Sequence, residues 1–155
     1  MNTTDLKLCF IGFGEAAEAF WGGMDHSPVR SVSSYDVLTD APGSPEHKAM
    51  VARCDALQVP VCASLEAAVS QADIVISVVT ADKANAVAEA TAPLMKTAAL
   101  FFDCNSCAPQ TKQASAKVID AVGGRYVDVA VMAPVNPGRN RTPLLLSGPH
   151  VDDAK

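Results

Sequence analysis

The sequence of 155 residues has little of what marks a membrane or nucleic-acid-binding protein. No apolar run approaches the roughly 18 residues that a membrane-spanning helix needs. Residues 1–6 lack the basic start and the long apolar stretch of a signal peptide. Lys and Arg together number 12 against 17 Asp and Glu, so the net charge is −5. This acidic balance argues against nucleic acid or an anionic membrane surface as a partner.

Cysteine and histidine are also sparse, and their spacing is irregular. Five cysteines are an odd number without a disulfide framework, which favours a reducing compartment such as the cytoplasm. Cys104 and Cys107 form a Cys-x-x-Cys pair, but a zinc site would need two further ligands at suitable spacing. We interpret the two thiols as small residues that flank a functional loop. We predict no metal site, and we place the scattered His26, His47 and His150 on the surface.

Short apolar segments alternate with helical patterns along the whole chain. The strands are predicted at 6–11, 29–35, 59–62, 73–79, 98–102, 126–132 and 144–146. The helices are predicted at 17–24, 44–57, 64–72, 82–93 and 109–122, with Ser44, Ser64 and Asp82 as N-caps. Strands that alternate with helices predict an α/β protein with a mostly parallel sheet and helices on both faces.

The first predicted strand runs directly into a glycine turn and then a helix. Residues 12–17 read Gly-Phe-Gly-Glu-Ala-Ala, which fits the G-x-G-x-x-G/A fingerprint of dinucleotide-binding Rossmann folds. Gly12 permits the tight turn, Gly14 has no side chain to block a pyrophosphate, and Ala17 lets the helix pack closely. The helix N-terminus offers free N–H groups to phosphates. We therefore predict a doubly wound Rossmann fold whose cofactor contacts here are Gly12, Phe13, Gly14, Glu15 and Ala16.

Asp36 ends the second predicted strand, about 20 residues past the glycine turn, where an acid binds the adenosine ribose hydroxyls. A carboxylate at this position repels the 2′-phosphate of NADP. No Lys or Arg follows between Val37 and Pro45 to offset that repulsion. The sequence thus predicts NAD as the cofactor, with NADP disfavoured.

The residues from 11 to 17 resemble the β-hydroxyacid dehydrogenases, which include 6-phosphogluconate and 3-hydroxyisobutyrate dehydrogenases. Three later segments resemble this family in the same order: 77–80 (Ser-Val-Val-Thr), 103–109 (Asp-Cys-Asn-Ser-Cys-Ala-Pro) and 126–131 (Tyr-Val-Asp-Val-Ala-Val). The resemblance covers nearly the whole chain. It implies that Val79, Thr80 and Asn105 contact the cofactor, and that Asn105 and Ser106 lie near the nicotinamide and the substrate.

The chain departs from the family pattern in its substrate loop. Many relatives carry a serine and two glycines where this sequence has Met132, Ala133 and Pro134. The resemblance places Met132 and Ala133 at the substrate, but the hydroxyl that would hold a substrate carboxylate is absent. Backbone amides or Asn136 are the alternatives for that task.

The resemblance also implies a general acid/base lysine at the start of a second, helical domain, beyond Lys155. We therefore expect no catalytic residue in this chain and no activity from the chain alone. The expected organisation is a dinucleotide-binding domain at 1–148 and, at 149–155, a tail or the start of a linker to that absent C-terminal domain. The full-length protein is expected to be a homo-oligomer.

The predicted function is that of the NAD-binding domain of an oxidoreductase, which transfers a hydride between a nicotinamide cofactor and a small hydroxy acid. Two alternatives remain: a stand-alone dinucleotide-binding or sensing module, and a methyltransferase-like domain that binds S-adenosylmethionine. Ala17 and the Asn105–Ser106 pair favour the dehydrogenase over the methyltransferase. The dehydrogenase and the stand-alone module differ only in the presence of a second domain beyond Lys155.

Overall fold

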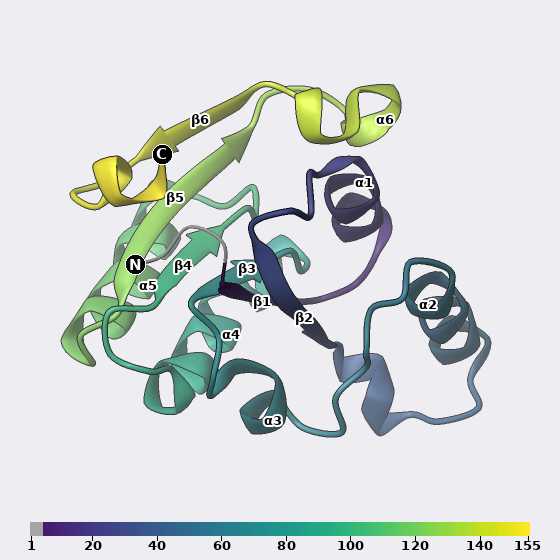
Figure 1. Cartoon of the computed structure of the whole chain (residues 1–155). Helices are drawn as coiled ribbons and strands as arrows, with labels where there is room; N and C mark the ends of the chain where they lie inside the picture. The colour runs from purple at the N-terminus through teal and green to yellow at the C-terminus, as the bar shows by residue number, and fades with distance from the viewer. Residues whose placement is uncertain (1–4) are drawn as a thin grey trace.

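The chain forms a six-stranded sheet in the order β2-β1-β3-β4-β5-β6, in a computed structural model that describes residues 5–155 (Figure 1). The strands are β1 (Leu6–Ile11), β2 (Val29–Tyr35), β3 (Ile74–Ser77), β4 (Leu100–Asp103), β5 (Arg125–Val131) and β6 (Leu144–Ser147). The first five are parallel, and β6 runs antiparallel to β5. The chain turns to one side of β1 to form β2 and then crosses to the other side to form β3. The predicted doubly wound Rossmann fold is confirmed.

The helices lie between successive strands. They are α1 (Glu15–Gly23), α2 (Pro45–Ala56), α3 (Leu65–Val69), α4 (Ala84–Thr91), α5 (Pro109–Ala121) and the single turn α6 (Val135–Gly138). Short 3₁₀ segments are η1 (Val37–Asp40), η2 (Ala81–Lys83), η3 (Ala92–Leu94), η4 (Arg139–Arg141) and η5 (Val151–Ala154). The predicted N-caps Ser44 and Ser64 are confirmed, because their hydroxyls accept the N–H groups of His47 and Ala67.

Each face of the sheet has its own hydrophobic core, and alternate residues of β1 enter the two cores. Cys9 and Ile11 point to the face that α3, α4 and α5 cover. Leu8 and Phe10 point to the opposite face, where α1 and α2 pack (Figure 1). Farther along that second face, a smaller cluster centred on Val127 packs against Leu146 of the neighbouring strand β6 and Ala154 of η5. The helices on both faces hold the carboxyl ends of the strands in fixed positions.

Two predicted features are wrong for local reasons. The strand predicted at 59–62 is a single parallel bridge between Ser34 and Val61. Pro60 lacks an N–H group, so the ladder does not extend past this bridge. Asp82 does not cap a helix, because η2 takes up residues 81–83 and α4 follows with Lys83 at its N-cap.

Several predicted boundaries differ from the structure by a few residues. The strand predicted at 98–102 begins at Leu100, because Ala98 sits in a turn with φ +65°. The helix predicted at 64–72 ends at Val69, and the strand predicted at 73–79 covers only Ile74–Ser77. Residues 1–4 of the predicted domain lie outside the described residues. Within residues 5–155, no helix has the length and apolar character to cross a membrane.

Candidate functional site

The glycine turn after β1 is fixed between the ends of β2 and β3. The Gly12 N–H donates to the Tyr35 carbonyl over 2.8 Å. Gly12 has φ +82°, and a Cβ on it would collide with the Val78 carbonyl oxygen, so only glycine fits. A Cβ on Gly14 would meet nothing within 4 Å. Gly12 is therefore required by the fold, whereas Gly14 leaves open space for a ligand.

The N-terminus of α1 is open toward this space. Gly14 is its N-cap and has no side chain to accept the first N–H groups of the helix. These groups and the positive end of the helix dipole make a binding position for an anion such as a phosphate.

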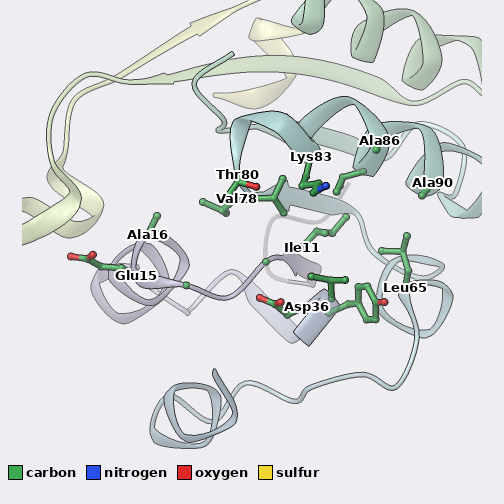
Figure 2. Close-up of a pocket in the computed structure, with 16 residues that line it drawn as sticks. Ile11, Glu15, Ala16, Asp36, Leu65, Val78, Thr80, Lys83, Ala86 and Ala90 are labelled. Carbon is green, nitrogen blue, oxygen red and sulfur yellow. The ribbon is translucent and has the colours of Figure 1, made fainter. Parts of the chain in front are cut away.

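Asp36 connects the end of β2 to the glycine turn. Its Oδ2 accepts the Phe13 N–H over 2.9 Å, and its Oδ1 accepts the Leu38 N–H over 3.0 Å. A carboxylate oxygen accepts more than one hydrogen bond, so each of these oxygens has capacity left for a hydroxyl. The carboxylate is half-buried and faces the cleft in Figure 2. It is placed to bind a pair of vicinal hydroxyls beside the turn.

A cleft of about 650 Å³ runs along the carboxyl ends of β1, β2 and β3 (Figure 2). The switch point of a doubly wound sheet, here between β1 and β3, is where such folds bind ligands. Seven predicted cofactor residues line this cleft: Gly12, Gly14, Glu15, Ala16, Asp36, Val79 and Thr80. Thus the predicted residues from three separate segments meet at one site.

Phe13 is a predicted cofactor residue that does not line the cleft. Its side chain is fully buried in the core and packs edge to face on Phe10, with ring centroids 5.5 Å apart. Phe13 is linked to the site through its backbone, because Asp36 accepts its N–H group.

The α4 side of the cleft was not predicted from the sequence. Lys83, Ala86, Val87 and Ala90 line it, and their spacing of three, one and three residues is that of one helix face. Apolar side chains from β2, η1 and α3 complete this part of the lining: Tyr35, Val37 and Leu65. Val37 is 70% exposed. An apolar surface beside a carboxylate suits a purine ring with its ribose.

A smaller cleft of about 200 Å³ lies at the carboxyl ends of β4 and β5. Asn105 and Ser106, both predicted near the substrate, line it together with Lys112 and Asp128. The predicted substrate residues Met132 and Ala133 line neither cleft. They are exposed residues that come directly after β5.

The Asn105 side chain is committed to internal hydrogen bonds. Its Oδ1 accepts the Val79 N–H over 2.7 Å, and its Nδ2 donates to Ser77 Oγ and Asp103 Oδ1 over 3.1 and 2.7 Å. The residue is only 5% exposed. Because Val79 lines the large cleft, Asn105 links the loop after β4 to the cofactor side of the sheet.

Asp103 is the centre of a buried polar network that the sequence did not indicate. It accepts the Tyr126 hydroxyl over 2.7 Å and pairs with the Lys112 ammonium over 3.1 Å. Lys112 also reaches Asp128 over 2.9 Å, and its side chain is only 11% exposed. Burial and the bond to Asp103 raise the pKa of Tyr126. The phenol is therefore a permanent donor at physiological pH.

The surroundings of Cys104 and Cys107 do not favour a reactive thiol pair. Burial raises the pKa of Cys104 to about 12, and the neighbouring Asp103 charge adds to this. Burial and the same charge also raise the pKa of Cys107. Both thiols stay protonated at neutral pH, which makes them poor nucleophiles. Across residues 5–155, no group of three or more His, Cys, Asp or Glu side chains is placed to hold a metal ion.

Residues 30–151 match the family described as the NAD binding domain of 6-phosphogluconate dehydrogenase. The chain belongs to this family. The match begins after the glycine turn. The turn and the match are therefore separate indications of a dinucleotide-binding domain. Family membership decides against the methyltransferase-like alternative. None of the curated proteins matches the chain in sequence.

Solved structures share the fold of this chain. A conserved hypothetical protein from Sinorhizobium meliloti 1021 is 33% identical with a TM-score of 0.86, over 96% of this chain and 49% of that one. The conserved protein MTH1747 is described as structurally similar to 3-hydroxyacid dehydrogenases. It is 25% identical with a TM-score of 0.79, over 96% of this chain and 52% of that one. The 3-hydroxyisobutyrate dehydrogenase of Mycobacterium tuberculosis shares the fold at 18% identity and a TM-score of 0.76, over 96% of this chain and 48% of that one. The chain spans about half the length of these structures.

Proposed function

We propose that this chain is the NAD-binding half of an oxidoreductase that transfers a hydride between the nicotinamide and a small hydroxy acid. The observation that carries the proposal is the position of Asp36. Asp36 follows the last residue of β2, and its carboxylate lies beside the glycine turn and lines the large cleft. In this arrangement Asp36 holds the adenosine ribose, the α1 N-terminus holds the pyrophosphate, and the bound cofactor supplies the hydride acceptor.

Asp36 is also the basis for proposing NAD rather than NADP. The shared fold does not decide this point, because an imine reductase from Myxococcus stipitatus, 19% identical with a TM-score of 0.75, was solved in complex with NADP+. A 2′-phosphate on the ribose would approach the Asp36 carboxylate and be repelled by it. Among the residues that line the cleft, Lys83 is the only cation, and it stands on η2 rather than beside Asp36 at the end of β2 (Figure 2).

We propose that a C-terminal helical domain completes the substrate site and supplies the general acid/base lysine. The relatives are about twice as long as this chain, which supports a second domain. Residues 1–148 would then form the cofactor domain, and 149–155 would lead toward the second domain. Ser106, Met132 and Ala133 are all exposed and would meet it. We further propose a homo-oligomer in the cytoplasm, a compartment consistent with five free cysteines.

Calorimetric titration of the purified chain with NADH and NADPH tests the cofactor assignment. NADH should bind at least tenfold more tightly, which corresponds to about 1.4 kcal/mol. Asp36→Ala should narrow the difference between the two affinities, mainly by weakening the binding of NADH. Asp55→Ala, which removes an exposed carboxylate from α2 outside the cleft lining, is the matched control and should change neither affinity. Equal affinities in the parent chain contradict the NAD preference, and no binding of either cofactor contradicts the dinucleotide role.

A turnover assay tests whether the site is incomplete. The same chain should produce no NADH from NAD and a panel of small hydroxy acids, because positioned proton transfer contributes about 10²–10⁴ in rate. Robust turnover by the 155-residue chain would contradict the need for a second domain. A protein that has no second domain beyond Lys155, binds NADH and turns over no substrate would instead support the stand-alone binding module.

A further inference from the structure

Two carboxylates belong to the helix turn whose N–H groups would bind the pyrophosphate. Glu15 and Glu18 are both in the first turn of α1. An acid in a first turn stabilises a helix through the dipole. A dinucleotide, however, brings its own negative charges to the same N–H groups. These carboxylates therefore have to be held away from the ligand.

Glu18 is held by Arg53, which reaches across from α2. The Arg53 Nε donates to Glu18 Oε2 over 2.8 Å. The same guanidinium donates through Nη1 to the Phe13 carbonyl oxygen over 3.2 Å. The Arg53 side chain is 28% exposed and that of Glu18 is 50% exposed, so solvent screens the ion pair more than the part-buried contact to the Phe13 carbonyl.

Phe13 is consequently fixed by three contacts. Asp36 accepts its N–H, Arg53 donates to its carbonyl, and its ring packs on Phe10 in the core. Phe13 is the residue between Gly12 and Gly14. A contact that fixes Phe13 therefore also fixes the backbone that would face the phosphates.

We propose that Arg53 is a positioning residue for the dinucleotide. It holds the turn at residues 12–14 in its binding geometry and keeps the Glu18 carboxylate turned toward α2. The planar guanidinium makes both contacts at once, and a lysine ammonium on a flexible stem does not reproduce that fork. This inference rests on the proposed function, since it assigns Arg53 a role in binding the same cofactor.

The test is calorimetric titration of NADH into Arg53→Met and Arg53→Lys chains. Arg53→Met should weaken binding about tenfold, because it removes the hydrogen bond to the Phe13 carbonyl and releases the Glu18 carboxylate. Arg53→Lys should recover only part of this loss. Lys48→Met removes an exposed cation from the same helix and should leave the affinity unchanged.

Two further measurements separate positioning from a general loss of structure. Adenosine has no phosphate. Its affinity, measured by competition with NADH, should therefore be nearly the same in Arg53→Met as in the parent. Glu18→Gln should change NADH binding little by itself. In the Arg53→Met background it should restore part of the affinity, because the released negative charge is gone.

Each contrary outcome has its own meaning. A parent chain that binds no dinucleotide contradicts the proposed function. A parent chain that binds NADH, with Arg53→Met equally tight, overturns the role of Arg53 alone. The role is also overturned if Arg53→Met weakens adenosine as much as NADH, or if Glu18→Gln restores nothing.

Discussion

The Asn136 side-chain amide donates to the Glu15 carboxylate over 3.0 Å, although the two residues lie 121 positions apart in the chain. Asn136 belongs to α6, the turn that comes after β5, and Figure 1 shows this turn beside α1. In Figure 2 the Glu15 carboxylate points away from Asp36 and the centre of the cleft. The amide nitrogen that was an alternative holder for a substrate carboxylate is used for this contact.

Asn136→Ala is expected to weaken NADH binding by about two- to fivefold, which is less than about 1 kcal/mol for an exposed contact. The freed Glu15 carboxylate would then lie closer to the pyrophosphate. The loss should be larger at low salt, because salt screens exposed charges. Glu15→Gln is the control, since it should bind NADH at least as well as the parent, both alone and combined with Asn136→Ala. An Asn136→Ala chain with parental affinity at low salt would contradict this role.

The two glycines of the turn should respond oppositely to substitution. Gly14→Val should abolish NADH binding while the thermal unfolding midpoint stays near that of the parent, because no atom of the chain lies near the new Cβ. Gly12→Ala should instead destabilise the fold, since φ +82° alone costs about 1–3 kcal/mol and the Cβ also collides with Val78. Melting and titration of both variants check this contrast. Normal NADH binding by Gly14→Val would make the turn a purely structural corner.

Much of the fold was predictable because its signals are local. The apolar strand runs, the serine N-caps at 44 and 64, and the glycine turn each depend on a few adjacent residues. The strand predicted at 59–62 was wrong because Pro60 has no N–H group to continue the strand pairing, although the segment is apolar. The N-cap predicted at Asp82 was wrong because a 3₁₀ turn precedes α4.

The site was predictable only where a motif is local. Gly12, Gly14 and Asp36 are recognisable from their spacing along the first two strands. Arg53 lies 40 residues from the Phe13 carbonyl to which it donates, and nothing in the sequence links the two. The residues on the α4 side of the cleft have a helical spacing that is visible in the sequence. Which face of the helix meets the cleft, however, depends on how the helix packs.

Asp73 should make the stability of the protein depend on acidic pH. Its carboxylate accepts the Lys7 N–H over 2.8 Å and pairs with the Lys96 ammonium. Burial by itself raises the pKa of Asp73, but these two partners lower it overall. The stabilisation is therefore present above the unfolded pKa of about 4 and is lost as pH falls through the lower folded value.

Asp73→Asn should accordingly lower the free energy of unfolding by about 1 kcal/mol at pH 7. Urea denaturation at pH 7, 5 and 3 should show this gap constant between pH 7 and 5 and smaller at pH 3. Asp5→Asn, in an exposed ion pair with Arg30, is the control and should cost little at any pH. A gap that widens at pH 3 would contradict the lowered pKa.

The Asp103 network should be the most sensitive polar feature of the fold. Asp103 is 1% exposed, so Lys112→Met leaves a buried carboxylate without its cation, at a cost of about 3–5 kcal/mol in urea denaturation. Tyr126→Phe removes only one donor and should cost about 1–3 kcal/mol. Lys112→Met combined with Asp103→Asn should recover part of the first loss, because the uncompensated charge is then removed. A double variant that is as unstable as the sum of its single variants would show that Lys112 acts by packing rather than by pairing with Asp103.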